Sequence, residues 1–144
     1  MTEVRLARAP PEVWAALALR RAVFVDEQGV ALEEELDGRD DDAVHLVAVE
    51  PDGTVNGTCR LRRDGVTVKL ERMAVAPGAR GHGLGSALVA EAERAAGEAG
   101  AERIALAAQV AAIGLYERAG YVAYGERFLD AGLEHQMMEK RLSG

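Results

Sequence analysis

The sequence predicts a mixed α/β domain whose elements follow the order β-α-β-β-β-α-β-α-β-β. Between residues 45 and 75, short apolar runs are separated by Pro-Asp-Gly and Arg-Asp-Gly turns, which predicts three strands joined as a meander. An amphipathic stretch over 84–99 stands between the last of these strands and an apolar run at 104–108. Strand, helix and strand in this order predict a parallel pair with a right-handed crossover, so the central sheet is expected to be mixed.

The first elements are expected to be a short strand and a helix. Val4 and Leu6 alternate with polar neighbours, as in a strand with one buried face. Pro10 and Pro11 favour the first turn of a helix, and Gly29 is a suitable stop for a helix extended through the preceding residues. The apolar stripe of this helix consists of Val13, Trp14, Leu17 and Ala18.

The third strand of the meander contains a change of phase. The three strands are expected at 45–49, 55–61 and 66–75. In the third, Val66, Val68 and Leu70 share one face, whereas Met73 and Val75 fall on the other. A slip of one residue is what a β-bulge produces. A strand buried on both faces would also lack a clean alternation, and that interpretation stays open.

The C-terminal part of the chain is expected to hold one more helix and two more strands. Gly100 and Gly120 are suitable stops for the helices that precede them. The remaining elements are placed at 111–119, 121–124 and 136–140.

Composition narrows the functional classes. The formal net charge is −7, whereas nucleic-acid binding needs a basic field. No apolar run has membrane-spanning length, and the first residues lack the apolar stretch of a signal peptide. The single cysteine, Cys59, rules out an internal disulfide framework. With 49% hydrophobic residues, the chain is expected to form one globular domain over 1–144. The single cysteine and the lack of a signal peptide predict a cytoplasmic protein. The negative charge and the lack of a membrane-spanning run predict that it binds neither nucleic acid nor membranes.

The acidic run over 33–42 has two interpretations. It lacks the alternating carboxylates that an EF-hand needs before its glycine. We expect most of these side chains to form a solvated loop. The alternative is that one or two of them face a cleft and attract a cationic amine. His45, His82 and His135 lack the spacing of zinc ligands, so no metal site is expected.

Three glycines within five residues stand where the helix over 84–99 must begin. The first amides of a helix have no partner and carry positive potential, so a phosphate binds there if no side chain blocks it. Gly81, Gly83 and Gly85 remove the Cβ atoms and permit turn geometry, and Arg80 adds a charge and a forked donor. The spacing is neither that of a P-loop nor that of a dinucleotide fingerprint. A phosphate or pyrophosphate site is expected here.

These residues carry a resemblance to a known family. Arg80-Gly-His-Gly-Leu-Gly85 resembles motif A of the GNAT acyltransferase superfamily, R/Q-x-x-G-x-G/A, and it follows the strand Leu70-Glu-Arg-Met-Ala-Val75 as it does in that family. Residues 109–121 are similar to the second signature, N-x-x-A-x-x-x-Y-x-x-x-G-F/Y. Residues 20–29 and 133–137 further resemble the ElaA-like or YjcF-like bacterial subgroup. The resemblance covers nearly the whole chain and implies the GNAT-type acyl-CoA N-acyltransferase fold.

The resemblance implies acetyl-CoA as co-substrate, bound where two parallel strands splay. Its pantetheine arm would pair with backbone groups of Met73, Ala74 and Val75. It would also contact Gln109, which stands where the family usually has asparagine. Its pyrophosphate would lie on the amides of Arg80, Gly81, His82, Gly83, Leu84, Gly85 and Ser86.

The resemblance also implies catalytic roles. Tyr116 matches the general acid that protonates the departing thiolate; otherwise it is an ordinary helix tyrosine. Glu71, on the cofactor strand, is a candidate general base; otherwise it forms an ion pair with Arg72 or Lys69. Deprotonation without a dedicated side chain is the remaining alternative.

The acceptor pocket is expected between the first helix and the C-terminal strands, with Glu27, Gln28 and His135 as candidate substrate contacts. The alternative for Glu27 is a solvated carboxylate at the end of the helix. The alternative for His135 is a capped or surface histidine. The function expected is N-acetyl transfer from acetyl-CoA to a primary amine of a small molecule or peptide. A non-catalytic acyl-CoA-binding regulatory module is the alternative, and a homodimer is left open.

Overall fold

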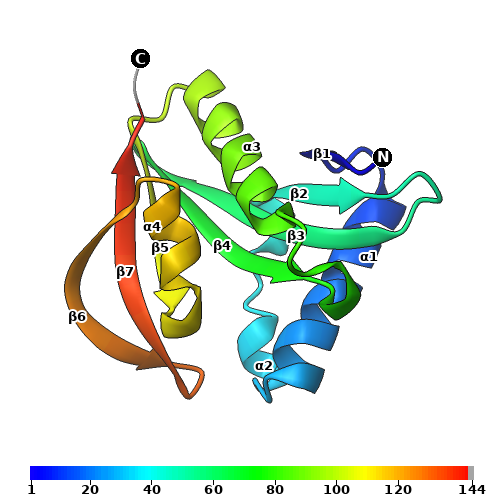
Figure 1. Cartoon of the computed structure of the whole chain (residues 1–144), viewed down its shortest axis with the longest axis horizontal. Helices are drawn as coiled ribbons and strands as arrows, with labels where there is room; N and C mark the ends of the chain where they lie inside the picture. Colours follow the sequence, from blue (N-terminus) through cyan, green and yellow to red (C-terminus); the bar gives the residue numbers. More distant parts are fainter. Residues whose placement is uncertain (143–144) are drawn as a thin grey trace.

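Seven strands form one mixed sheet in the order β1-β2-β3-β4-β5-β7-β6 in the computed structural model, which describes residues 1–142 (Figure 1). The strands are β1 (Glu3–Leu6), β2 (Val44–Val49), β3 (Val55–Asp64), β4 (Thr67–Val75), β5 (Arg103–Gln109), β6 (Val122–Asp130) and β7 (Leu133–Arg141). The helices that match the expected ones are α1 (Pro10–Arg20), α3 (Leu84–Glu98) and α4 (Ile113–Arg118). The additional helical segments are η1 (Arg21–Glu27), α2 (Leu32–Glu35), η2 (Asp40–Asp42), η3 (Pro77–Ala79) and η4 (Val110–Ala112). The expected order of the seven strands and of helices α1, α3 and α4 is confirmed.

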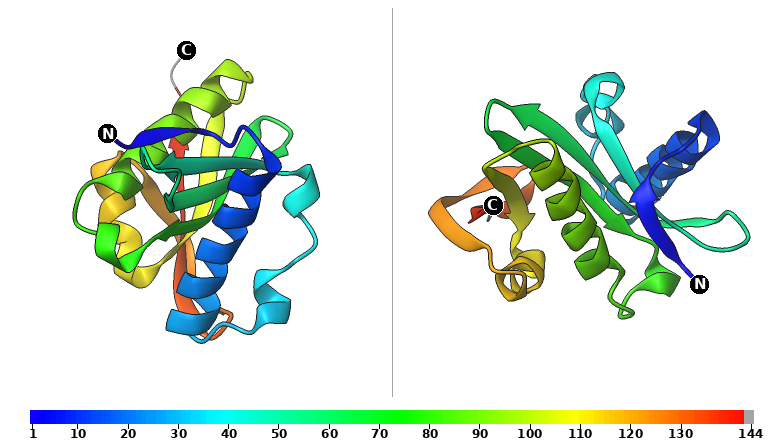
Figure 2. Two further views of the ribbon diagram at one scale, coloured as in Figure 1. Left: turned by 90° about the vertical axis from the view of Figure 1, so that its right-hand side faces the viewer. Right: turned by 90° about the horizontal axis from the view of Figure 1, so that it is seen from above.

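Helices cover both faces of the sheet (Figure 2). The larger core lies between the sheet and helices α3 and α4, and it includes Leu70, Leu88, Ile104 and Met138. A smaller cluster of Ala16, Val47, Val49 and Val55 lies where α1 packs on the other face. No helix among residues 1–142 is both long and apolar enough to cross a membrane.

Helix α1 continues without a break into the π-helical turns of η1. Gly29, with φ +77°, follows this extended helix, as expected from the sequence. The extension matters for function because its last residues, Glu27 and Gln28, both contact residues of the expected acetyl-CoA site.

The closing strands are longer than the sequence analysis expected. We placed them at 121–124 and 136–140, whereas β6 and β7 cover Val122–Asp130 and Leu133–Arg141. Strand β6 lies at the edge of the sheet and all of its residues are exposed. An exposed edge strand needs no apolar alternation, so the pattern that identifies a half-buried strand is absent there.

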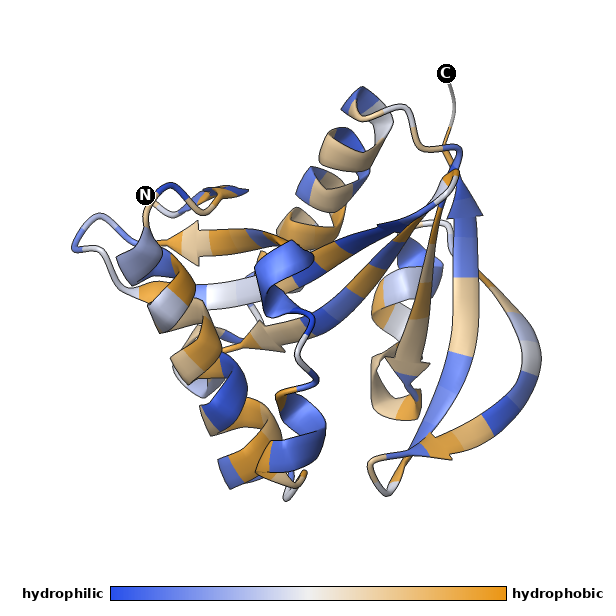
Figure 3. Cartoon of the chain, turned by 180° about the vertical axis from the view of Figure 1, so that it is seen from behind, coloured by the Kyte–Doolittle hydropathy of each residue, from blue (hydrophilic) through white to orange (hydrophobic). Residues whose placement is uncertain are grey.

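The acidic segment is only partly ordered by ion pairs, and Glu33, Glu34, Asp41 and Asp42 are exposed, as expected for most of its side chains. Glu35, which is only 2% exposed, accepts hydrogen bonds from Arg20 and Arg72. Asp37 and Asp40 both form ion pairs with Arg60. Figure 3 shows the hydrophilic helix α2 of this segment beside η1. The expectation fails for these three carboxylates because their arginine partners lie on α1, β3 and β4, far away in the chain.

Strand β4 contains the bulge that its change of phase predicts. Glu71 is opposite Arg60, but the next pair is Ala74 opposite Thr58, so β4 has one residue more than β3 between them. Within this bulge Arg72 has φ +57°, in the left-handed region that residues with a side chain rarely adopt.

Strands β4 and β5 are paired over only part of their length. The parallel register joins Thr67 to Arg103, Val68 to Ile104 and Lys69 to Ala105, and the strands then separate (Figure 1). Each strand stays paired with its other neighbour beyond this point. The carboxyl halves of β4 and β5 thus form the walls of a gap within the sheet.

Candidate active site

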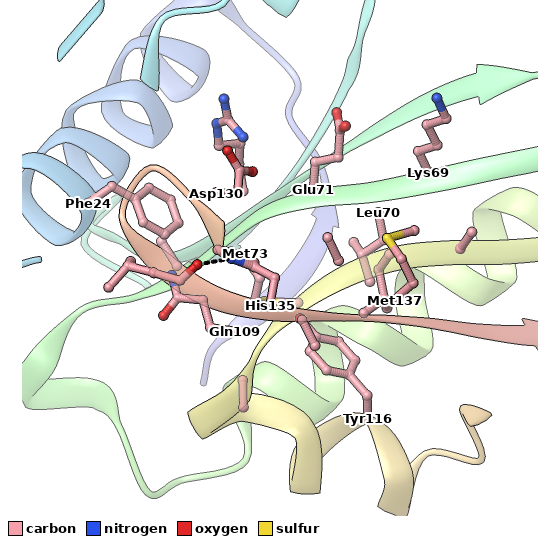
Figure 4. A pocket seen from close by; sticks show the side chains of 18 of the residues that line it. Phe24, Lys69, Leu70, Glu71, Met73, Gln109, Tyr116, Asp130, His135 and Met137 are labelled. Atoms are coloured by element: carbon pink, nitrogen blue, oxygen red, sulfur yellow. Dashed lines mark hydrogen bonds between the residues drawn. The ribbon is translucent and has the colours of Figure 1, made fainter. Parts of the chain in front are cut away.

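A cavity of about 700 Å³ lies at this gap (Figure 4). Strands β4, β5 and β7 contribute most of its lining, and residues of η1, α2, α4, β6 and several loops complete it. The cavity brings together many of the residues that the sequence singles out: Gln28, Glu71, Met73, Ala74, Val75, Arg80, Gln109, Tyr116 and His135. Glu27 and the glycine-rich loop from Gly81 to Ser86 are not part of its lining.

The glycine-rich loop immediately precedes helix α3. Gly81 and Gly83 have φ of +81° and +82°, and a Cβ added to either would have no heavy atom within 4 Å. Backbone conformation, rather than protein crowding, therefore requires glycine at these two positions, and the space over them is open. Gly85 differs, since its Cβ would lie 3.3 Å from the Leu115 side chain, where α3 approaches α4 closely.

Arg80 and Glu27 form an ion pair with two hydrogen bonds. Arg80 Nη1 and Nη2 donate to the two carboxylate oxygens at 2.7 and 2.8 Å, and Arg80 Nε donates to the Val75 carbonyl at 3.0 Å. The hydrogen bond from Arg80 lowers the pKa of Glu27. The sequence analysis assigned these residues to different ligands, and the structure makes them partners.

Gln28 and Gln109 join the end of η1 to the end of β5. Gln109 Nε2 donates to Gln28 Oε1 at 2.9 Å, and Gln28 Nε2 donates back to Gln109 Oε1 at 3.4 Å (Figure 4). Both amides line the cavity. The sequence analysis expected Gln28 to contact the acceptor and Gln109 to contact the pantetheine arm, so this pair of hydrogen bonds connects the two expected binding regions.

Tyr116 projects from α4 and is 5% exposed. Its ring packs edge-on against Tyr121, with centroids 5.9 Å apart. Burial raises the pKa of the Tyr116 phenol above its ordinary value. The phenol therefore remains protonated at neutral pH and has a proton to donate into the cavity.

Glu71 is bound by two arginines. Its carboxylate accepts hydrogen bonds from Arg62 Nε at 2.7 Å and from Arg60 Nη2 at 2.8 Å. Burial raises the pKa of Glu71, but these hydrogen bonds outweigh burial and hold the pKa below its ordinary value. The ion pair that we considered for Glu71 is present, although with Arg60 and Arg62 instead of Arg72 or Lys69. A carboxylate stabilised in this way is a weak base.

His135 lies on β7, is 9% exposed and lines the cavity. Its Nδ1 is 2.8 Å from the Leu133 carbonyl oxygen, and its ring stacks on Phe128 with centroids 5.8 Å apart. The alternative of a surface histidine is thus wrong, since the side chain is buried and held on two sides.

The arginine–carboxylate network beside the cavity was not foreseen. Arg20 and Arg60 are each 1% exposed, and Arg72 lines the cavity. Their partners are the acidic residues Glu35, Asp37, Asp40 and Glu71. The one signal in the sequence was the placement of Arg60 and Arg72 on adjacent predicted strands. Among residues 1–142, no cluster of His, Cys, Asp or Glu has the geometry of a metal site.

The comparisons with known proteins agree with this architecture. Residues 14–142 match the model of the acetyltransferase (GNAT) domain. The uncharacterized N-acetyltransferase YjcF of Bacillus subtilis is 35% identical over 136 residues, which cover 94% of this chain and 96% of YjcF.

Solved structures show the same fold. The crystal structure of an acyl-CoA N-acyltransferase from Pseudomonas aeruginosa has a TM-score of 0.84 and 31% identity, covering 97% of this chain and 99% of that one. Escherichia coli ElaA shares the fold with a TM-score of 0.81 and 22% identity, covering 96% and 97% of the two chains. The resemblance in sequence is confirmed by the domain model, by a relative along nearly the whole length and by these structures: the chain belongs to the GNAT acetyltransferase family.

Proposed function

We propose that this protein transfers the acetyl group of acetyl-CoA to a primary amine of a small molecule or peptide. The observation that carries the proposal is the gap between β4 and β5, where a cavity extends from Tyr116 to His135 (Figure 4). Family membership supports an acetyltransferase, and the details of donor and acceptor rest on the residues described above.

The residues present suit acetyl-CoA. Because the pairing of β4 with β5 ends at Lys69, backbone groups near Met73 that face the gap are free to pair with an extended pantetheine arm. The open space over Gly81 and Gly83 and the first amides of α3 suit a pyrophosphate. Arg80, which is half exposed, adds positive charge between these two regions.

The chemistry proposed for the cavity needs an acceptor amine, an oriented thioester and a proton for the leaving group. Acetyl-CoA supplies the activated acetyl group. The Tyr116 phenol donates a proton to the departing sulfur. Gln28 and His135 line the acceptor side, and Glu27 stands beside it at the end of η1.

The first experiment is a thermal melt with acetyl-CoA. A ligand at 100 times its dissociation constant adds about 2.7 kcal/mol of stability, so the midpoint is expected to rise. The second is a thiol-release screen with aliphatic monoamines, diamines, amino sugars and a lysine peptide. A midpoint unchanged by millimolar acetyl-CoA contradicts the proposal. A raised midpoint without turnover on any amine favours a non-catalytic acyl-CoA-binding module instead.

A further inference from the structure

The two faces of the sheet place Tyr116 and His135 on opposite sides of the gap. Ile104 and Leu106 of β5 belong to the core under α3 and α4, so alternation puts Gln109 on the other face. His135 is directly opposite Gln109 in the antiparallel register, and paired residues share a face. Tyr116 belongs to the core on the α4 side. Both side chains nevertheless line the same cavity, because the sheet is open between them.

The contacts of His135 determine which of its nitrogens is free. A carbonyl oxygen only accepts, so the 2.8 Å contact with Leu133 requires the proton to be on Nδ1. In the neutral ring, Nε2 then carries a lone pair on the edge turned away from Leu133. The stacking of the ring on Phe128 holds this edge in one orientation. Among the described residues, Nδ1 is the only ring nitrogen of His135 with a hydrogen-bond partner.

We propose that His135 is the general base of the reaction and takes the proton of the acceptor ammonium on Nε2. This inference rests on the proposed function. An amine is mostly protonated at neutral pH and must become neutral before it can attack, and histidine is the side chain most often used for such a transfer. Glu71 is less suited, because Arg60 and Arg62 stabilise its ionised form.

The placement of His135 fits the direction of the reaction. His135 accepts one proton from the ammonium, and the neutral nitrogen forms a bond to the acetyl carbon from that side. The carbon–sulfur bond breaks with its electron pair on sulfur, which receives the Tyr116 proton from the other side. The remaining excess proton on nitrogen passes through water to the Tyr116 phenolate, and the His135 imidazolium releases its proton to solvent. The products are an N-acetylated amine and free coenzyme A.

The first test needs no acceptor. Long-range ¹H–¹⁵N spectra distinguish protonated from unprotonated imidazole nitrogens, and the spectrum of His135→Asn identifies the signals of His135. We expect Nδ1 to carry the proton and Nε2 to be unprotonated in the neutral ring. A proton on Nε2 overturns the proposal whether or not an acceptor is known.

The second test uses the amine with the fastest thiol release in the screen. His135→Asn keeps an amide N–H that can donate to Leu133 but has no base, and we expect its single-turnover rate to fall roughly 10²–10⁴-fold with unchanged acetyl-CoA affinity. Added imidazole should restore part of the rate in His135→Gly. Glu71→Gln tests the competing base.

The outcomes of the second test are separable. The role of His135 is overturned, while acetyl transfer stands, if His135→Asn keeps the wild-type rate. It is also overturned if Glu71→Gln loses more activity than His135→Asn and imidazole does not rescue His135→Gly. A wild-type protein that neither binds acetyl-CoA nor acetylates any amine overturns the proposed function itself, and with it the role of His135.

Discussion

Arg72 Nε donates to Glu35 Oε2 at 2.7 Å, and this contact joins the bulge of β4 to a buried carboxylate of the acidic segment. Arg72 has φ +57°, a conformation that costs an ordinary residue roughly 1–2 kcal/mol. Its guanidinium also donates to the carbonyl oxygens of Glu34 and Glu35. The acidic segment therefore supports the bulge that the acetyl-CoA site is proposed to use.

Replacing Arg72 separates the backbone strain from the ion pairs. Arg72→Ala and Arg72→Gly both remove the contacts with Glu35, but glycine adopts φ +57° without strain. We expect both variants to be less stable than wild type, with Arg72→Gly more stable than Arg72→Ala by about 1 kcal/mol. Urea unfolding measures the difference.

Lys69 provides the matched control for this comparison. It lies on the same strand, and its φ is not positive. Glycine in a strand is less stable than alanine by roughly 0.5–1 kcal/mol, so the order of Lys69→Ala and Lys69→Gly should be reversed. If the order is the same at both positions, strain at Arg72 is not the cause.

The network predicts a loss of stability in acid. The hydrogen bonds from Arg60 hold the pKa of Asp37 below its ordinary value, and Arg62 and Arg60 overcome burial to do the same for Glu71. In the unfolded chain such groups titrate near pH 4. A lowered folded pKa contributes stability that is fully present above the unfolded value and is lost as pH falls through the folded value. We expect the free energy of unfolding to decrease below about pH 4.

Urea unfolding between pH 6 and pH 3 checks this dependence. Asp37→Asn should reduce the slope, because it removes one of the carboxylates with a lowered pKa. Asp41→Asn is the control, since Asp41 is exposed and has no ion pair among the described residues. Equal slopes for wild type and Asp37→Asn would contradict the role assigned to this carboxylate.

The glycine-rich loop is tested by Gly83→Val. The added side chain occupies open space over the start of α3, where the pyrophosphate is proposed to lie, and we expect acetyl-CoA binding to be lost in calorimetry. Gly53→Val is the matched control. Gly53 has φ +91° and equally open surroundings but lies in the turn between β2 and β3. Both variants introduce similar backbone strain, so a loss of affinity in Gly83→Val alone would result from the blocked site and not from strain. Unchanged acetyl-CoA binding by Gly83→Val would mean that the loop glycines are needed only for backbone conformation.

Tyr116→Phe removes the proposed proton donor and preserves the packed ring. We expect the single-turnover rate to fall roughly 10²–10⁴-fold if thiolate departure limits it, with acetyl-CoA affinity preserved. Tyr121→Phe removes the hydroxyl of the neighbouring ring, which is outside the cavity lining, and should keep the wild-type rate. Wild-type turnover in Tyr116→Phe would exclude the phenol from the mechanism.

Features that depend on neighbouring residues were predictable from the sequence. The order of helices and strands along the chain, the bulge near Arg72 and the positive φ of the loop glycines each follow from patterns within a few residues. The resemblance to the family predicted that Tyr116 acts on a ligand bound where two parallel strands separate. No local pattern in the sequence shows by itself that Tyr116 and this gap share one cavity.

Features that depend on distant partners were not predictable. Glu35 is buried because arginines from α1 and β4 surround its carboxylate, and these partners are 15 and 37 residues away. The Arg80–Glu27 ion pair likewise spans 53 residues. Composition alone describes such charges as solvated, since it does not show which surfaces the fold brings into contact.

The consecutive residues Glu27 and Gln28 form hydrogen bonds with two different residues of the proposed donor site, Glu27 with Arg80 and Gln28 with Gln109. An anion bound at Arg80 competes with Glu27 for the guanidinium and so changes the restraint on the end of η1. Because Gln28, at this same end, lines the proposed acceptor side, we expect donor and acceptor binding to be linked equilibria. Reciprocity then requires the acceptor to change the affinity for the donor by the same factor as the donor changes the affinity for the acceptor.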